Sequence, residues 1–294
     1  MHKILELLNV GMLMEAERFS GFLHAYRTMT PLAVVERKPR VLTTETGPLA
    51  LGMSDAYVIA PGGVAIVGVF GPMYKGYGDY GYADQSQLRG SIRQAANDPA
   101  VSAIMLVIDS PGGSVAGTND LYSEVASANA VKPVVAYIED CGCSAAYWTA
   151  AGAREIYSNG GMVGSIGVVT ALVDSSKYFE NAGVKVIPIV TGEMKAVGME
   201  GTPVTPQQVD YVQDMIDSIY QDFVGAVAKS RGIRGETVKK MEAKVFYGQS
   251  AVDAKLVDGI MSFDKALSNL TRSVKKGGSN ARAKSLLKFE EMQD

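Results

Sequence analysis

Two short stretches, IDSPGGS at residues 108–114 and CGCSAAYW at residues 141–148, decide the fold of this chain. Each follows an apolar run, at 104–107 and at 133–138, and each leads from small turn-forming residues into a helical pattern. Open α/β sheets are built from such strand–turn–helix units, and they place their sites beyond the carboxyl ends of the strands. We therefore expect an α/β fold whose site lies at these two turns.

Predicted strands and helices alternate around the two turns, which implies mostly parallel strands joined by crossover helices. Apolar residues recur at three- and four-residue spacing from Val209 to Val227, which predicts a long helix with one core-facing stripe. The predicted strands are 64–70, 103–109, 133–138, 154–157, 168–173 and 184–190, and the predicted helices are 84–97, 114–128, 144–152, 174–182, 205–231, 235–243, 248–255 and 263–275.

The regular pattern begins well inside the chain, because the first 60 residues lack it. There we expect an amphipathic helix over 12–28 and irregular structure over 31–55. Beyond them, the glycine–tyrosine stretch 71–82 predicts a loop, either near a site or an interface or simply on the surface. The expected parts are a helical and irregular extension at 1–60, one α/β domain at 61–275 and a polar tail at 276–294.

Composition excludes several classes of protein. Of the 294 residues, 47% are hydrophobic and 20% are charged, which is typical of a globular domain, and the net charge of −3 with no basic stripe argues against a nucleic-acid partner. There is no run of about 18 apolar residues and no secretory signal, so we expect no membrane anchor and a cytoplasmic location.

The two cysteines, Cys141 and Cys143, lie two apart on a turn with no histidine nearby. Disulfide geometry disfavours a bond between them, and a metal site needs more ligands than this stretch offers. We expect both to pack as small apolar residues. The sequence accordingly implies no metal and no cofactor.

Ser144 is the candidate nucleophile, because it opens a helix directly after a buried strand. A serine in this place also favours a simple helix N-cap. The small neighbours Gly142, Ala145 and Ala146 leave it unshielded, so that a substrate backbone can approach it closely. A nucleophilic serine further needs a proton acceptor.

That acceptor is not expected to be imidazole, because His2 and His24 both precede the α/β pattern. Lys195 is the candidate instead, with a solvated loop lysine as the simpler alternative. It follows the predicted strand 184–190, whose carboxyl end should lie at the same sheet edge as Ser144. A lysine acts as a base only as the free amine, and burial among apolar neighbours such as Met194 and Val197 favours that form.

Four motifs follow one another along the chain: LVIDSPGG at 106–113, SAAYW at 144–148, GSIGV at 164–168 and TGEMK at 191–195. Together these motifs resemble the Ser–Lys proteases of the signal peptide peptidase A type. The resemblance covers about residues 62–270, and residues 246–259 (FYGQSAVDAKLVDG) also resemble the family's region after its long helix.

The resemblance implies a ClpP/crotonase-like α/β fold and a role for each site residue. Ser144 is implied as the nucleophile, Lys195 as its general base and Ser165 as the residue that orients the lysine amine. The implied oxyanion hole comprises Gly113, with Gly112, and the N–H of Ala145. The family usually has a glycine after the nucleophile, and Ala145 in its place narrows the cleft while keeping the backbone donor.

The resemblance also implies a polypeptide substrate and a ring-shaped homo-oligomer with inward-facing sites. Without an anchor, the chain is most similar to the phage head maturation proteases, which act on scaffold, capsid or portal proteins in the prohead within the host cytoplasm. A peptidase of the same family acting on signal peptides or in stress is the alternative.

Two further alternatives lie outside this family of enzymes. One is a crotonase-like enzyme that uses Asp109 or the pair Glu139 and Asp140. The other is a catalytically silent shell protein. A Clp-type triad is disfavoured, because it needs a histidine within the α/β core.

Overall fold

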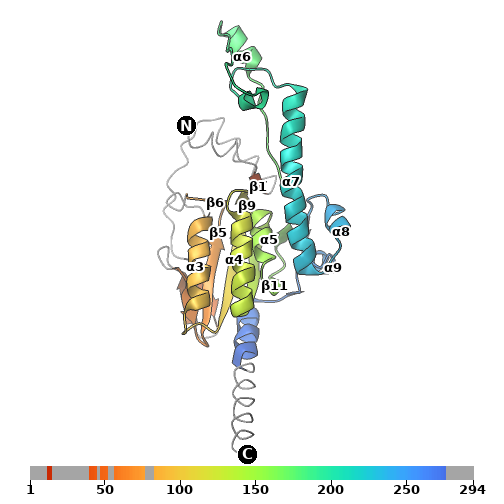
Figure 1. Cartoon of the computed structure of the whole chain (residues 1–294). Helices are drawn as coiled ribbons and strands as arrows, with labels where there is room; N and C mark the ends of the chain where they lie inside the picture. The colour runs from red at the N-terminus through yellow and green to blue at the C-terminus, as the bar shows by residue number, and fades with distance from the viewer. Residues whose placement is uncertain (1–11, 15–39, 45–46, 52–55, 77–82, 276–294) are drawn as a thin grey trace, which may run out of the picture.

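The computed structural model describes residues 12–14, 40–44, 47–51, 56–76 and 83–275. A mostly parallel sheet forms its centre, as the alternating pattern predicts (Figure 1). The strands are β1 (Met12–Met14), β2 (Arg40–Thr44), β3 (Gly47–Leu51), β4 (Val58–Ala60), β5 (Val64–Phe70), β6 (Met73–Tyr74), β7 (Ala83–Asp84), β8 (Ala103–Ser110), β9 (Gly112–Ser114), β10 (Val134–Cys143), β11 (Glu155–Ser158), β12 (Met162–Gly164), β13 (Val245–Tyr247) and β14 (Gly259–Ile260).

Helices lie on both faces of the sheet and beyond its edge. The α-helices are α3 (Gln85–Asn97), α4 (Thr118–Val131), α5 (Ala145–Ala150), α6 (Ser176–Asn181), α7 (Pro206–Arg231), α8 (Gly235–Lys239) and α9 (Gln249–Asp253); residues 263–275 form another helix, and η2 (Glu193–Ala196) is a 3-10 helix.

In the large sheet the strand order is β13-β12-β10-β8-β5-β4, and β11 continues the β10 edge toward β14. The strands β5, β8, β10, β11, β12 and β14 run parallel where they pair with one another, while β4 and β13 pair antiparallel at the edges. This arrangement fits the ClpP/crotonase-like α/β fold that the sequence predicts. The two glycine turns follow β8 and β10, which are neighbours, so both turns emerge at one edge of the sheet.

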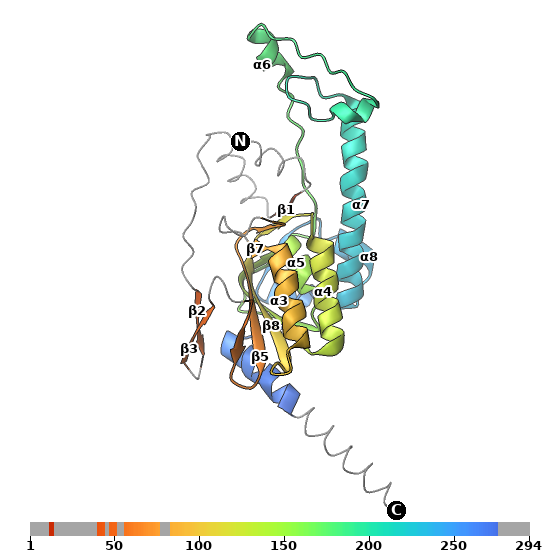
Figure 2. The ribbon, with the colours of Figure 1, turned by 60° about the vertical axis from the view of Figure 1, so that its left-hand side comes forward.

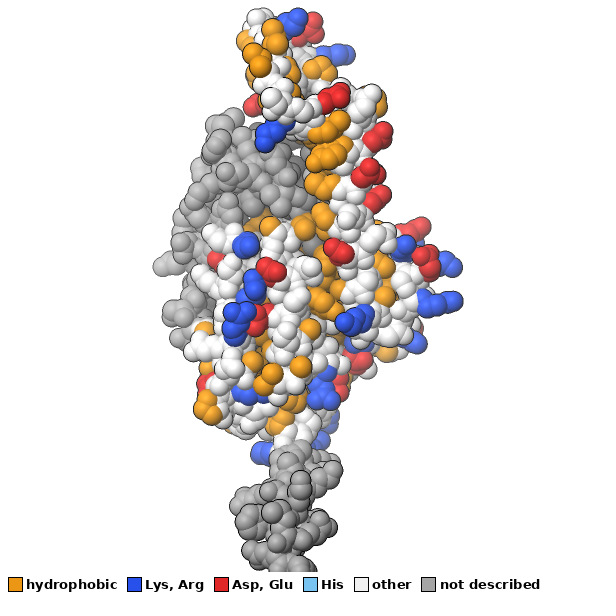
Figure 3. Space-filling view, in the orientation of Figure 1, with side chains coloured by type: hydrophobic (Ala, Val, Ile, Leu, Met, Phe, Trp, Pro, Cys, Tyr) orange, Lys and Arg blue, Asp and Glu red, His pale blue; other side chains and the backbone are white. Residues whose placement is uncertain are grey.

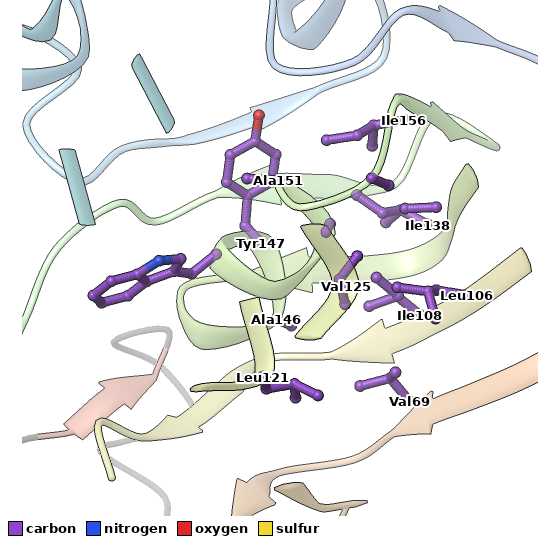
Figure 4. Packing of buried hydrophobic residues seen from close by; sticks show 14 of the residues in the cluster. Val69, Leu106, Ile108, Leu121, Val125, Ile138, Ala146, Tyr147, Ala151 and Ile156 are labelled. Atoms are coloured by element: carbon purple, nitrogen blue, oxygen red, sulfur yellow. The ribbon is translucent and has the colours of Figure 1, made fainter. Parts of the chain in front are cut away.

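Successive residues of the central strands point to opposite faces, and both faces are buried. In β8, Ile104, Leu106 and Ile108 pack under α3, α4 and α5, as Figure 4 shows for several of these side chains. Met105 and Val107 pack against the helix of residues 263–275 on the other face. A strand buried on both faces has an unbroken apolar sequence, which is why 104–108 shows no alternation.

One half of α7 packs on the domain, and the other half projects beyond it (Figures 1 and 2). Phe223, Val224 and Val227 are buried, and the Phe223 ring stacks on Trp148 with 4.6 Å between the centroids. Toward its start, α7 leaves the sheet and joins α6 and η2 at the far end of the molecule. We call residues 169–219 the arm.

The arm is where the sequence prediction fails most clearly. Strands expected at 168–173 and 184–190 are not formed, and residues 184–190 are mostly exposed. Residues 184–190 lie in a projection where no strand of the described ranges runs beside them, so their β-branched side chains have no sheet to join there. The prediction that all apolar positions of α7 face the core is also wrong. The first half of the helix lies in the same projection, and Val209 there is 49% exposed.

Smaller corrections concern the first turn and the extension. The helix expected from residue 114 begins at Thr118, because β9 and a left-handed Gly117 intervene. Residues 12–14 form a strand rather than the start of a helix, and the rest of that expected helix lies outside the described residues. The region 31–55 contains a β2–β3 hairpin rather than irregular structure throughout, because its Val, Leu and Thr residues favour strands.

The loop predicted at 71–82 likewise contains a buried strand, β6, while residues 77–82 lie outside the described part of the chain. β6 belongs to a small second sheet with the order β1-β9-β6-β7. The polar tail expected at 276–294 also lies outside the described residues. The division into an extension, a domain and a tail stays a prediction.

Candidate active site

Ser144 joins β10 to α5 in a backbone conformation that serine rarely adopts. Its φ is 56° and its ψ is −123°, whereas non-glycine residues seldom have positive φ. A serine held on a strained strand-to-helix turn presents its hydroxyl at the end of the sheet. The Ser144 side chain makes no capping hydrogen bond to α5, which removes the plain N-cap interpretation.

The hydroxyl of Ser144 is buried and has no hydrogen-bond partner among the residues that the structure describes. The residue as a whole is 0% exposed. An unpartnered buried hydroxyl costs about 1–3 kcal/mol, so such a group persists where function requires it. Strain and an unsatisfied hydroxyl therefore coincide at the residue that the sequence singles out.

Ser165 lies close to Ser144, because the residue before it, Gly164, accepts a hydrogen bond from the Ser144 main chain. β10 and β12 pair with Cys143 opposite Gly164, and the Ser144 N–H donates to the Gly164 carbonyl at 2.8 Å. Ser165 also has a positive φ, of 50°, and its N–H donates to the Lys244 carbonyl at 3.0 Å. The main chain thus fixes both serines relative to each other.

The first glycine turn forms β9 next to this pair, and α5 packs against it. Gly113 approaches β6 so closely that an added Cβ would lie 1.8 Å from the Met73 carbonyl oxygen, so no side chain fits there. The Gly112 N–H donates to Ser110 Oγ at 3.2 Å. Gly112 therefore has a partner already, and Gly113 is the better candidate oxyanion donor, together with Ala145 at the first turn of α5.

Buried polar contacts that sequence analysis missed hold β9 and α5 in place. Gln85, which is fully buried, donates to the Ser114 carbonyl and to Thr118 Oγ1, each at 3.1 Å. Tyr147 donates to the Leu256 carbonyl at 2.8 Å, and burial raises the pKa of its hydroxyl, which keeps it protonated. The contact of Gln85 could have been found from the sequence, because this glutamine lies in line with the apolar positions of the 84–97 helix.

Lys195 lies elsewhere. It is an exposed residue of η2 in the arm, and no hydrogen bond or ion pair of the described residues links it to Ser144 or Ser165. Between the start of α7 at the arm and Phe223 at the Trp148 contact there is roughly 25 Å of helix. The expectation that a sheet strand delivers Lys195 to the edge beside Ser144 is wrong, because residues 184–190 join no sheet.

Other candidate chemistry finds less support in the geometry. Asp140 is exposed, and its carboxylate accepts from the Asn159 amide at 3.0 Å. Cys141 and Cys143 are buried and are not joined by a disulfide, as expected for packing residues. Within the described ranges, no three His, Cys, Asp or Glu side chains gather closely enough to hold a metal ion, and no helix is both long and apolar enough to cross a membrane.

The structure thus defines the class of protein as an α/β domain with a mostly parallel sheet and a strained serine between a central strand and a short helix. Comparison with known proteins gives the family. Residues 126–276 match peptidase family S49, and the chain belongs to that family.

Relatives of the chain include phage and bacterial proteins. It is 33% identical over 177 residues to capsid assembly protease C of Escherichia phage lambda, which is 60% of this chain and 40% of the relative. It is 30% identical to the head-tail preconnector protein GP5 of Enterobacteria phage P21, over 70% of this chain and 42% of the relative. Protease 4 of Haemophilus influenzae is 28% identical over 73% of this chain and 35% of its own length. The chain spans less than half the length of each of these three relatives.

Proposed function

We propose that the chain is a serine endopeptidase in which Ser144 is the nucleophile. The observation that carries the proposal is the conformation of Ser144, strained and with an unpartnered hydroxyl, beside the glycine turn of β9. Ser144 Oγ gives its proton to a general base and attacks the substrate carbonyl. The C–N bond then breaks to leave an acyl ester, the base passes the proton to the leaving amine, and water hydrolyses the ester. The N–H groups of Gly113 and Ala145 stabilise the oxyanion.

Lys195 is the general base in this proposal, and Ser165 orients its amine. Since Lys195 lies in the arm of its own chain, we infer that each site takes its lysine from the arm of a neighbouring copy. Exposed apolar residues of the arm support such a contact, because they need a partner surface: Val173, Tyr178, Ile187 and Ile189 are all more than 60% exposed. Figure 3 shows hydrophobic side chains along the projecting half of α7.

A mixing experiment tests this arrangement. Ser144→Ala and Lys195→Ala are each expected to lose at least a thousand-fold in kcat on an extended fluorogenic peptide, because a nucleophile or its base is gone. Mixed one to one and reassembled, the two inactive variants should regain about a quarter of wild-type activity, since random assembly gives one site in four an intact serine and an intact lysine.

The outcomes are distinct. Recovery in the mixture supports a dyad shared between copies, whereas two inactive variants that stay inactive together place both groups in one chain. Full activity in Ser144→Ala would remove the nucleophile, and full activity in Lys195→Ala would remove the base. Arg234→Ala, a change to a cation outside the arm, is the matched control and should leave kcat unchanged.

We further propose that the substrates are phage scaffold, capsid or portal proteins, because two relatives at 30% identity or more carry capsid-assembly or head-tail names. Signal peptides are the alternative substrate, favoured by the likeness to protease 4. Incubating wild type and Ser144→Ala with both substrate classes, and following new amino termini by mass spectrometry, decides between them.

A further inference from the structure

The strand β9, which carries the proposed oxyanion donor, is already paired with another segment of the chain. Residues Met12–Met14 form β1 and run antiparallel to β9, with Leu13 opposite Gly113 and Met14 opposite Gly112. Figure 1 shows β1 beside β9, near the start of α5. A segment a hundred residues away in the sequence thus lies on the strand next to Ser144.

β9 has two edges, and both are taken. β6 occupies one edge, where Met73 lies opposite Gly113, so the strand order is β1-β9-β6-β7. Peptides commonly bind extended to a sheet by adding a strand to an open edge, through main-chain hydrogen bonds. The edge of β9 that is free of β6 is the one where an added peptide would align with Gly113, and β1 occupies that edge.

The burial of Ser144 is consistent with a substrate-binding edge that another segment already occupies. Ser144 is 0% exposed and Ser165 is 8% exposed, so a peptide in solution cannot reach the hydroxyl in this state of the chain. A peptidase site must open before a substrate reaches it. The element that has to leave for a peptide to pair with β9 is β1.

We propose that residues 12–14 are a built-in occupant of the substrate-binding edge, bound as an extended peptide would be and displaced when a substrate binds. The evidence for this inference is the β1–β9 register. That the β9 edge binds a substrate rests on the proposed peptidase function. It names the ligand class of the β9 edge: an extended polypeptide, antiparallel to residues 112–114, held chiefly through its main chain.

The energetics suit a displaceable occupant. Three paired residues form few hydrogen bonds, each worth about 0.5–1.5 kcal/mol net, and ordering the segment offsets much of this gain. Tethering nevertheless presents the segment at an effective concentration on the order of millimolar. A weak peptide ligand thereby becomes a substantial competitor for substrates of similar affinity.

A binding experiment tests the proposal without any catalysis. In a Ser144→Ala background, we compare the full chain with the double variant Leu13→Pro, Met14→Pro. Adjacent residues of a strand point their N–H groups to opposite sides, so one of the two prolines must remove an N–H that faces β9. The matched control is Leu13→Ala, Met14→Ala, which trims the side chains and keeps both N–H groups. The probe is a dye-labelled peptide of residues 8–18 (LNVGMLMEAER), followed by fluorescence anisotropy.

The probe should bind the proline variant about ten-fold or more tightly than it binds the full chain, with the alanine control close to the full chain. A chain lacking residues 1–14 should match the proline variant, which guards against an effect of the prolines on folding. Equal affinity in all of these proteins, or no binding to any of them, overturns the proposal.

Activity provides the second measurement. With Ser144 intact, the proline variant should lower KM for an extended fluorogenic peptide about ten-fold and leave kcat unchanged, because a competitor has been removed. If the probe distinguishes the variants but none of them cleaves peptides, the occupancy stands and the proposed function fails. If all of them cleave with the same KM and bind the probe equally, the function stands and the occupancy fails.

Discussion

The α/β domain and the arm contain similar apolar runs, but the run in the domain is buried and the run in the arm is exposed. In the domain, the strand residues Ile104 and Leu106 are fully buried under helices on one face of the sheet, and Met105 is fully buried on the other. In the arm, Ile187 is 69% exposed and Ile189 is 95% exposed, although the run around them is as rich in β-branched residues as a core strand. Hydrophobic pattern alone does not separate a residue that packs within its chain from one that needs a partner.

The same contrast runs along the single helix α7. Its start is capped by Thr205 in a capping box with Gln208, and its end is buried against α5 through Phe223. The helix is therefore defined at both ends, but the domain covers one half of it. Its rigid length carries the arm, and with it Lys195, away from the serine of the same chain.

The largest expected effect is a loss of stability that distinguishes the two halves of α7. Phe223→Ala removes a ring stacked on Trp148 and should lower the free energy of unfolding by about 3–4 kcal/mol, because the buried site cannot collapse fully. Tyr211→Ala, an aromatic truncation in the same helix at a residue 49% exposed, should cost less than about 0.5 kcal/mol. Urea unfolding followed by circular dichroism measures both. Similar losses in the two variants would mean that the arm half of α7 is packed as firmly as the domain half.

An intermediate change in stability is expected at Ser144, where the domain has a strained backbone turn. Ser144→Gly should abolish the proposed peptidase activity and raise the free energy of unfolding by about 1 kcal/mol, because glycine accepts a φ of 56° without the strain that serine bears. Ser144→Ala is the matched control: it removes the same unpartnered hydroxyl but keeps the strained Cβ. Thermal unfolding in which the glycine variant is less stable than the alanine variant would show that the turn stores no strain.

The sequence predicts much of the domain because its signals there are local. The apolar runs before residues 108–114 and 141–148 define two neighbouring parallel strands, and the small residues after them define the two turns. Ser144 and Ser165 lie close together because each follows a strand of the same sheet, and those two strands, β10 and β12, pair next to each other.

What the sequence does not predict depends on contacts between distant segments. The side chains of residues 12–14 give no sequence signal for a strand, because these three residues pair with β9 through their backbone. The location of Lys195 escapes prediction for a related reason. Whether 184–190 enters the sheet depends on whether a neighbouring strand exists, and the apolar run itself is compatible with either outcome.

The smallest effect on folding, and the sharpest test of the comparison, is expected in the arm. Ile189→Ser should change the free energy of unfolding of the isolated chain by less than about 0.5 kcal/mol, because a side chain 95% exposed loses almost no packing. If the arm contacts a second copy as proposed, the same change should shift assembly toward smaller species in sedimentation velocity. Val131→Ser, at an exposed residue of the domain, is the matched control and should leave assembly unchanged. A variant at residue 189 that sediments as wild type does would mean that this residue takes no part in the contact between copies. The partner surface of the arm would then have to be sought along α7, where Val209, Tyr211 and Met215 are exposed apolar residues.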